Sequence, residues 1–185
     1  MKKHKNSIVA IGPLKSRFLP TSRLSLCVMF VSVNRSKTKH KHIMETATKT
    51  QITVEALVKV PVEKVWNHWF APEHITKWCA PSDDWHAPKA ENDLRTGGKF
   101  STTMAAKDGS MSFDFEGTYT NVVPNKVVEY TIADGRKVKI IFGSKGAETL
   151  ITEIFETESI NPIEMQRGGW QAILDNFKKY SEANA

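Results

Sequence analysis

Residues 161–182 decide the fold, and they read NPIEMQRGGWQAILDNFKKYSE. They predict an amphipathic helix, because large apolar residues recur at the i, i+3, i+4 and i+7 spacing of a 3.6-residue period: Trp170, Ile173, Leu174 and Phe177. Asn161 is a suitable N-cap, and Pro162 suits the first helical turn. Gly168 and Gly169 each cost about 1 kcal/mol relative to alanine inside a helix, which predicts a compensating gain, either close approach to a sheet or a kink over a cavity. The apolar stripe therefore needs a partner surface.

The preceding part of the chain is expected to supply that surface as a sheet. Residues 52–60 alternate apolar and polar side chains, which is typical of a strand with one buried face. Pro61 and Pro72 each mark the start of a short helix with a small apolar face. Residues 84–155 then read as consecutive strands separated by turn residues. Hairpin connections of this kind predict a mostly antiparallel sheet.

The order of these elements predicts an α+β helix-grip fold. We expect a curved antiparallel sheet of about six to seven strands wrapped around the long C-terminal helix, with two short helices after the first strand. Within the sheet, Asp134-Gly135 is the strongest hairpin signal and predicts a type I′ turn, in which both central residues have positive φ. A cavity between the helix and the curled sheet is the expected outcome.

Charge is distributed unevenly along the sequence. Ten of the 26 Lys and Arg residues, and none of the 20 Asp and Glu residues, lie in residues 1–43. Residues 44–185 therefore carry 16 basic and 20 acidic side chains. Because they show no basic stripe interleaved with aromatic residues, we expect no nucleic-acid partner.

The first 43 residues form a basic extension with an apolar run at residues 24–33. We interpret the extension as disordered or not native, with Met44 as the working start and residues 44–185 as the domain. A targeting segment and a disordered basic arm stay open as alternatives. The apolar run is too short to span a membrane, and no small-residue cleavage pattern of a secretory signal follows it.

The two cysteines, Cys27 and Cys79, give no disulfide framework. Cys79 stands beside Trp78, where a lone thiol is typical of a small packed hydrophobe rather than a nucleophile. This usage fits a reducing compartment, so we expect the protein to be cytoplasmic.

Five short motifs, together with Leu174 in the last helix, carry a resemblance to a known family. In order, they are VPVEKVW (60–66), WFAPEHITKW (69–78), LRTGGKF (94–100), FEGTY (115–119) and GGW (168–170). With this order and spacing, residues 51–182 resemble the START-related, Bet v 1-like helix-grip superfamily (SRPBCC), and within it the group named after the activator of Hsp90 ATPase homologue 1. The resemblance implies a deep, mainly apolar pocket, which the wider superfamily uses for lipids, sterols, polyketides and plant hormones, sometimes with catalysis. The chaperone regulator that names the group also has a separate N-terminal domain, and residues 1–43 are too short to be one.

The sequence offers few candidates for chemistry. It contains no metal-ligand spacing, nucleotide-binding loop or nucleophile elbow, so we expect no metal and no cofactor. We interpret His68, His74 and His86 as solvated or capping histidines. Arg136 follows the Asp-Gly turn and is interpreted as a surface arginine, with a place at a pocket mouth as the alternative.

Two carboxylates, Asp114 and Glu116, alternate with Phe113 and Phe115 along one predicted strand. If the aromatic rings face the cavity, the carboxylates are solvated. In the inverse arrangement burial would raise their pKa values, which would suit a general base or a polar ligand handle.

The leading hypothesis is a binding domain for a small apolar or amphipathic molecule. The side chains expected to line its cavity are Trp66, Trp69, Phe100, Phe113, Phe115, Tyr130, Phe142, Trp170, Leu174 and Phe177. Two alternatives stay open: a cyclase- or dehydratase-like enzyme that uses polar groups in the pocket, and a chaperone- or stress-related interaction module. No catalytic residue is assigned, and the sequence is compatible with a homodimer.

Overall fold

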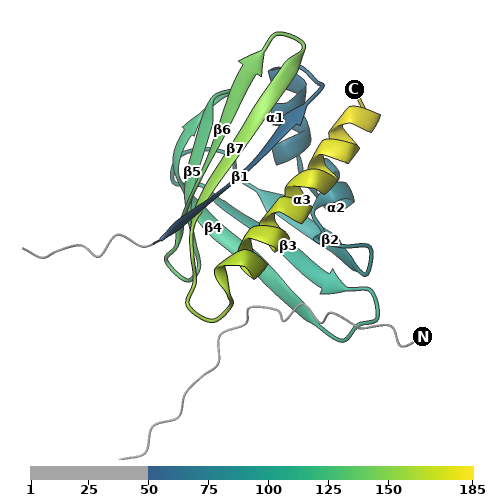
Figure 1. Cartoon of the computed structure of the whole chain (residues 1–185), viewed down its shortest axis with the longest axis vertical. Helices are drawn as coiled ribbons and strands as arrows, with labels where there is room; N and C mark the ends of the chain where they lie inside the picture. The colour runs from purple at the N-terminus through teal and green to yellow at the C-terminus, as the bar shows by residue number, and fades with distance from the viewer. Residues whose placement is uncertain (1–49) are drawn as a thin grey trace, which may run out of the picture. The chain divides into compact units, whose positions relative to one another are not determined.

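One antiparallel sheet forms the body of residues 50–185, which are the residues that the computed structural model describes (Figure 1). Its seven strands lie in the order β1-β7-β6-β5-β4-β3-β2. The strands are β1 (Gln51–Val58), β2 (Trp85–Asn92), β3 (Lys99–Ala106), β4 (Ser112–Val123), β5 (Val127–Ile132), β6 (Lys137–Lys145) and β7 (Glu148–Glu156). The predicted domain start at Met44, and both alternatives for the basic extension, lie outside the described residues.

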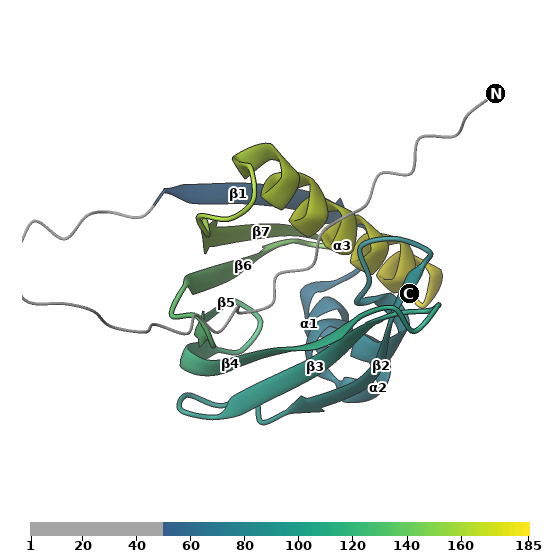
Figure 2. The ribbon, with the colours of Figure 1, turned by 90° about the horizontal axis from the view of Figure 1, so that it is seen from below.

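Three helices complete the fold: α1 (Val62–Phe70), α2 (Pro72–Trp78) and α3 (Ile163–Ala183). The two short helices follow β1, and α3 follows β7, as the sequence predicts. Figures 1 and 2 show the sheet curling so that α3 lies across its concave side. The predicted α+β helix-grip fold is therefore confirmed. No helix within residues 50–185 is long and apolar enough to cross a membrane.

Strict alternation places the core on the concave face. Every second residue of β1 and β7, and of β6 as far as Phe142, is buried, and these inward rows meet the buried side chains of the helices. The pairing register aligns the strands, so that Val54 of β1 lies opposite Glu153 of β7, which in turn lies opposite Ile140 of β6. Side chains in such a row point the same way, because the side-chain period of a strand is two.

One flank of α3 is hydrogen-bonded to the edge strand β1. The side chains of Arg167 and Gln171 donate to the carbonyl oxygens of Thr53 and Glu55, at 3.0 and 3.2 Å. Further along the helix, Lys178 donates to the carbonyl oxygen of the last but one residue of β1. These bonds satisfy backbone acceptors on a strand that has only one neighbour, and they fix where α3 crosses the sheet.

Three details differ from the sequence-based expectations. An added Cβ at Gly168 or Gly169 would meet nothing within 4 Å, so neither glycine serves close approach to the sheet. The helix begins at Ile163, and no side chain caps it. The hairpin between β5 and β6 forms as predicted, but Gly135 alone has positive φ (85°), so its turn is not type I′.

Candidate functional site

The ten aromatic and apolar residues predicted to line a cavity fall into two groups. Five are buried in the core: Trp69, Tyr130, Phe142, Leu174 and Phe177. Five are only partly buried: Trp66, Phe100, Phe113, Phe115 and Trp170. The second group is the informative one, because large apolar side chains on the inner side of a fold are normally covered.

Ring contacts connect the partly buried residues across the grip. Trp170 of α3 stacks on Phe155 of β7, with ring centroids 4.0 Å apart and planes at 11°. On its other side Trp170 approaches Phe115 of β4 edge-on at 6.1 Å. Phe115 in turn lies 5.8 Å from Phe100 of β3. A line of rings thus runs from the helix to the far strands of the sheet.

Phe100 lies where it does because β4 carries a glycine beneath its ring. A Cβ added to Gly117 would stand 2.6 Å from two ring carbons of Phe100 and 2.9 Å from the carbonyl oxygen of Thr131. Contacts this short do not occur between real atoms, so only glycine lets the ring lie flat over the strand. The motif FEGTY therefore shapes the inner surface at this point.

The two flanks of α3 differ sharply. The flank toward β1 is held by the bonds of Arg167 and Gln171 described above. On the flank toward α2 and β2, Asn176 donates to the carbonyl oxygen of Ala80 at 2.6 Å, which fixes only the C-terminal half of the helix. Gly169 lies on this same flank, about two helical turns earlier, where an added Cβ meets nothing. Among the residues that the structure describes, the N-terminal half of α3 makes no hydrogen bond of this kind on this flank, and Figure 2 shows α3 crossing above the far strands of the sheet.

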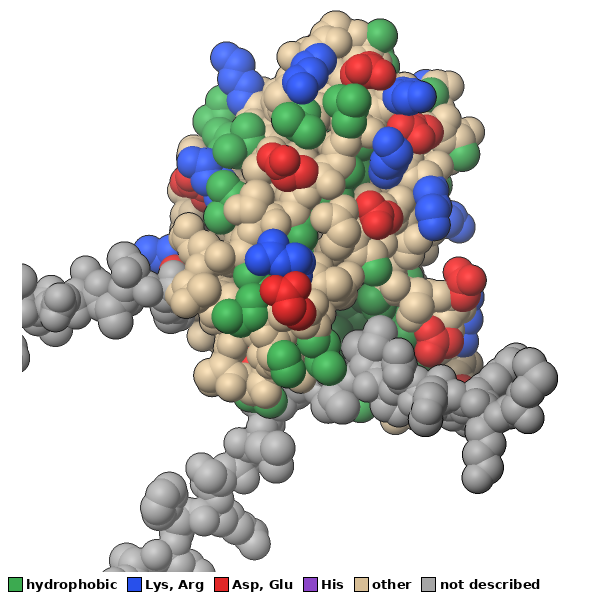
Figure 3. All heavy atoms as spheres, in the orientation of Figure 1, with side chains coloured by type: hydrophobic (Ala, Val, Ile, Leu, Met, Phe, Trp, Pro, Cys, Tyr) green, Lys and Arg blue, Asp and Glu red, His purple; other side chains and the backbone are tan. Residues whose placement is uncertain are grey.

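The space-filling view agrees with this asymmetry. Figure 3 shows Lys, Arg, Asp and Glu side chains interspersed over the face that carries α3, together with hydrophobic side chains in a recess between α3 and β3. An apolar recess beside α3 is a candidate entrance to the interior.

A carboxyl group, that of Glu153, lies on the concave face of the sheet among buried apolar side chains. Glu153 is 6% exposed and stands in β7 on the same face as Ile151 and Phe155. Its cross-strand neighbours, Val54 and Ile140, are apolar and buried. Its β1 neighbour Val54 stands between Thr53 and Glu55, the two residues whose carbonyl oxygens accept hydrogen bonds from Arg167 and Gln171 of α3.

Glu153 makes no hydrogen bond or ion pair with any residue of the described chain. Every fully buried side-chain nitrogen or oxygen in residues 50–185 has a hydrogen-bond partner. The oxygens of Glu153, which have none, must therefore retain contact with space that solvent can reach. Burial raises the pKa of this carboxyl from 4.5 to about 8, because removal from water disfavours the charged form. The group is mostly protonated at neutral pH.

Two further titratable side chains share this environment. Burial, followed by the nearby charge of Glu153, raises the pKa of the Tyr130 phenol well above its usual range. The same two causes raise the pKa of the Cys79 thiol to about 12. Cys79 is half-buried and its sulfur lies 3.7 Å from that of Met104, so it behaves as the packed, unreactive thiol that the sequence predicts.

The tyrosines on this face differ in their hydrogen bonding. The hydroxyl of Tyr119 donates to the side-chain oxygen of Asn92 at 2.8 Å, and Asn92 donates to the carbonyl oxygen of Phe70 at 2.6 Å. Tyr130 is 7% exposed, and its hydroxyl has no hydrogen-bond partner among residues 50–185. Glu153 and Tyr130 are thus two buried polar groups of the concave face whose hydrogen-bonding capacity is unused within the described chain.

Glu153 was not among the predicted site residues, although the sequence contains a signal for its position. Thr149, Ile151, Glu153 and Phe155 fall at every second position of the last strand. Three of them are residue types that suit a buried face, so the alternation predicts that Glu153 also points inward. A check for polar residues that share the alternation of the apolar residues in each strand would have identified Glu153.

His68 and His74 belong to a network that joins the three helices. His68 is 3% exposed, which corrects its interpretation as a solvated or capping residue, and its Nδ1 lies 3.0 Å from the Ser181 hydroxyl. His74 Nδ1 lies 2.6 Å from the Tyr180 hydroxyl. Burial, then the neighbouring His74 and Lys64, lowers the pKa of His68. These groups satisfy one another and tie α1 and α2 to α3, whereas the third candidate, His86, is exposed as predicted.

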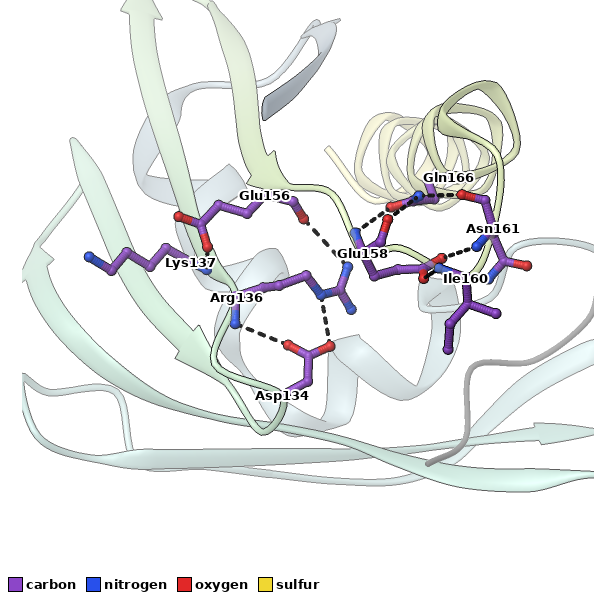
Figure 4. Close-up of polar contacts among 8 residues, drawn as sticks. All are labelled: Asp134, Arg136, Lys137, Glu156, Glu158, Ile160, Asn161 and Gln166. Atoms are coloured by element: carbon purple, nitrogen blue, oxygen red, sulfur yellow. Dashed lines mark hydrogen bonds and ion pairs between the residues drawn. The ribbon is translucent and has the colours of Figure 1, made fainter. Parts of the chain in front are cut away.

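Arg136 is also buried, at 7% exposed, which corrects its interpretation as a surface residue. Figure 4 shows its guanidinium at the end of the sheet, between Asp134 and the carbonyl oxygen of Glu156. Nε donates to Asp134 at 2.7 Å, and the backbone N–H of Arg136 donates to the same carboxylate at 3.0 Å. Arg136 is in phase with the buried Val138 and Ile140, and its hydrogen-bond partners compensate for the loss of water around the guanidinium.

The loop between β7 and α3 is held beside this arginine (Figure 4). Glu158 accepts hydrogen bonds from the backbone N–H groups of Ile160 and Asn161, and Gln166 bonds the backbone of Glu158 at 3.0 and 3.1 Å. Burial acts to raise the pKa of Glu158, but these N–H donors and the charge of Arg136 outweigh it, and the net pKa is lowered. The start of α3 is therefore fixed by polar contacts rather than by a cap.

Asp114 and Glu116 lie on the outer face of β4 and are exposed, whereas Phe113 and Phe115 point inward and are half-buried. This is the solvated arrangement of the two that the sequence left open. Neither carboxylate contributes to the interior.

The described surface also has two hollows outside the grip, where the loop after α2 meets the C-terminal half of α3. Their volumes are about 420 and 310 Å³. The larger is lined by Lys77, Trp78, Ala80, Ser82, Asp83, Trp85, Lys107, Asn176, Lys179 and Tyr180. None of the ten predicted residues lines either hollow. Both are open troughs with mixed polar lining, unlike an enclosed apolar site that would bury most of a ligand. No cluster of His, Cys, Asp or Glu within residues 50–185 could hold a metal ion.

The curled seven-stranded sheet, the helix pair after β1 and the long α3 define the helix-grip class of α+β domains. Residues 59–182 match the family described as Activator of Hsp90 ATPase homolog 1-like protein, so the chain belongs to this family, within the Bet v 1-like (SRPBCC) superfamily. The resemblance noted from the sequence motifs is thereby confirmed.

Solved structures agree with this assignment. An AHSA1-like protein from Aeromonas hydrophila is 42% identical, with a TM-score of 0.69, and the match covers 73% of this chain and 94% of that one. A protein from Cytophaga hutchinsonii is 57% identical, with a TM-score of 0.64 and coverage of 72% and 93%. A protein from Nitrosomonas europaea, at 20% identity and a TM-score of 0.63 over 72% and 95%, shares the fold alone. No match was found among curated proteins.

Proposed function

We propose that this chain is a binding domain for a small, mainly apolar molecule held between α3 and the concave face of the sheet. The observation that carries this proposal is the open inner flank of α3. There, Phe100, Phe115 and Trp170 remain partly exposed although their strands and helix turn them inward. Glycine, rather than a side chain that would fill the space, stands at position 169.

Two energetic arguments support a ligand at this place. Burying apolar surface contributes roughly 25 cal/mol of favourable free energy per Å². The exposed parts of these rings do not contribute this free energy to folding, so it is available to a ligand that covers them. Glycine inside a helix costs about 1 kcal/mol relative to alanine, and here no contact with the sheet explains that cost. Space reserved for a ligand would explain both.

The test is the binding of N-phenyl-1-naphthylamine, an uncharged dye that becomes fluorescent in apolar surroundings. The Gly169→Leu variant would project a side chain into the proposed space. The matched control is Gly168→Leu, because Gly168 is exposed and points to solvent. Both variants replace glycine by a better helix former, so both should fold.

We expect saturable dye binding by the unmodified protein and by Gly168→Leu, with affinity at least fivefold lower for Gly169→Leu. Absence of saturable binding by the unmodified protein would refute the proposal. Equal affinities for the two leucine variants would exclude the inner flank of α3 as the binding place.

A second candidate, a cyclase- or dehydratase-like enzyme, is supported by one observation. Such chemistry needs polar groups that converge inside the pocket, and Glu153 and Tyr130 are two buried polar side chains with unused hydrogen-bonding capacity in the described chain. Mass spectrometry of a bound ligand before and after incubation would test it, and an unchanged ligand would argue for binding alone.

A further inference from the structure

The polar groups inside the grip narrow the class of ligand, provided that the proposed function holds. Glu153 and Tyr130 are each more than nine-tenths buried, and neither has a hydrogen-bond partner within residues 50–185. Buried polar groups are normally hydrogen-bonded, and each one left unpaired costs free energy. Two such groups on one concave face suggest a partner that is not part of the described chain.

The two groups are neighbours across β6. Glu153 of β7 and Tyr130 of β5 both lie next to β6 residues of the same inward face, Ile140 and Val138 respectively. They are close enough for the charge of Glu153 to influence the Tyr130 phenol. An atom between them and α3 could therefore interact with both.

The ionisable groups near Glu153 and Tyr130 further restrict the class of ligand. The ionisable side chains that interact with Glu153 are Cys79, which follows α2, and Tyr130. Burial accounts for the raised pKa of Glu153, and no cationic group among residues 50–185 contributes to it. At neutral pH the carboxyl, the phenol and the thiol are all mainly uncharged, so the place offers hydrogen-bond donors without a positive charge.

We infer that Glu153 and Tyr130 together form a donor site for the carbonyl oxygen of an otherwise apolar ligand. The carboxyl O–H and the phenol O–H each donate to that oxygen, while the rings of Phe115 and Trp170 cover the apolar part. A neutral carbonyl gives both groups the acceptor that they lack. The ligand class is therefore an uncharged ketone, ester or amide with a hydrocarbon body.

Ligands with a charged polar group fit the site between Glu153 and Tyr130 less well than a neutral carbonyl does. A carboxylate would enter as an anion with no cation to pair it, and removing an anion from water without such a partner is expensive. An ammonium group would bind only if Glu153 ionised, so its affinity would rise with pH. A carbonyl needs the protonated carboxyl, so its affinity falls as pH rises through about 8.

The experiment compares three ligands with the same hydrocarbon body: 2-nonanone, nonanoate and nonylamine. Their affinities are measured by titration calorimetry and by displacement of N-phenyl-1-naphthylamine, between pH 6 and pH 9. We expect 2-nonanone to bind at least tenfold more tightly than nonanoate at pH 7, with affinity that declines above pH 8.

Four variants separate donation from packing. Glu153→Leu and Tyr130→Phe should each lower the affinity for 2-nonanone by about tenfold, the effect of one lost hydrogen bond, while dye binding persists. Glu153→Gln keeps a donor, so it should keep ketone binding and lose the decline above pH 8. Glu116→Gln, an exposed carboxyl on the outer face, is the control and should change nothing.

The outcomes distinguish this inference from the proposed function. If neither the dye nor any nine-carbon ligand binds, the proposed function fails and the inference falls with it. If the dye binds but 2-nonanone is no better than nonanoate, or Glu153→Leu keeps full ketone affinity, the inference alone is wrong. Preference for nonylamine, strengthening through pH 8, would overturn it in favour of a cationic ligand.

Discussion

Arg136 and Glu153 are both buried charged residues on the concave side of the same sheet, yet their surroundings are opposite. Arg136, at the end of the sheet, has the carboxylate of Asp134 at 2.7 Å and the carbonyl oxygen of Glu156 within reach. Glu153, in the middle of the face, has apolar neighbours and no partner in the described chain. Burial shifts the carboxyl of Glu153 toward its neutral form, whereas the guanidinium of Arg136 has a carboxylate partner.

The comparison distinguishes a buried charge that stabilises the fold, Arg136, from a buried carboxyl that has no such role, Glu153. A paired buried charge joins segments that must stay together, here the β5–β6 turn and the end of β7. An unpaired buried carboxyl contributes nothing of this kind and costs free energy through desolvation. We therefore propose that the sheet end serves stability and that the centre of the concave face serves ligand binding, and the following predictions test that division.

The largest expected effect is a pH dependence of stability that comes from Glu153. The carboxyl ionises near pH 4.5 when the chain is unfolded and near pH 8 when it is folded. Its folded pKa is raised, so its contribution is most favourable below pH 4.5 and is lost as pH rises toward 8. Relative to Glu153→Gln, the unmodified protein should lose on the order of 3 kcal/mol between pH 5 and pH 8.

Urea unfolding at several pH values measures this difference. Glu116→Gln, at an exposed position, should give a stability curve parallel to that of the unmodified protein. Parallel curves for Glu153→Gln as well would mean that Glu153 has an ordinary pKa, and the contrast with Arg136 would disappear.

Removing the arginine should produce the next largest effect. Arg136→Ala leaves Asp134 without its partner and removes a buried side chain, so we expect a loss of about 2–3 kcal/mol in the free energy of unfolding. Arg95→Ala is the matched control, because Arg95 pairs with Asp93 at the same two-residue spacing but is 70% exposed. An exposed pair of this kind contributes about 0.5 kcal/mol or less. Equal losses in the two variants would contradict a special role for the buried arginine.

The ring of Phe100 offers a test of the binding region by packing rather than charge. Gly117→Ala would place a methyl group 2.6 Å from that ring and 2.9 Å from backbone, so we expect a loss of about 1–3 kcal/mol and weaker dye binding. Gly143→Ala in β6 is the control, since its nearest contact is an ordinary 3.4 Å. Thermal unfolding and dye titration measure the two consequences, and unchanged dye affinity in Gly117→Ala would remove Phe100 from the binding surface.

The smallest effect concerns the open helix. Gly168→Ala should raise the free energy of unfolding by up to about 1 kcal/mol, because the position is exposed and an added Cβ meets nothing. Dye affinity should stay the same. A destabilised Gly168→Ala protein would show that this glycine serves the fold, which the present account denies.

Periodicity was sufficient to predict the fold. Alternating side chains gave the strands, and the stripe of Trp170, Leu174 and Phe177 gave the helix that crosses them. It was not sufficient at the Asp134-Gly135 turn. The dipeptide predicts a hairpin, but it does not determine how many residues remain unpaired in the loop. Turn type depends on the pairing of both strands, which the local sequence does not contain.

Both buried charged residues were visible in phase with apolar neighbours, yet neither was predicted to be buried. Arg136 is in phase with Val138, and Glu153 with Ile151. Hydropathy predicts a surface position for each residue, and only the fold shows that Arg136 pairs with Asp134 while Glu153 has no polar partner among residues 50–185. The alternation of a strand predicts which face a side chain occupies. It does not predict whether another segment of the folded chain supplies a hydrogen-bond or ion-pair partner for that side chain.

The most direct test of the central claim is an NMR titration of the Glu153 side-chain carboxyl carbon, in the free protein and with 2-nonanone bound. We expect a midpoint near pH 8 in the free protein, because the carboxyl is buried and has no partner among residues 50–185. We expect a higher midpoint in the complex, because the ketone binds the protonated form. A midpoint near 4.5 that the ketone does not change would contradict both the unpaired carboxyl and its role in binding.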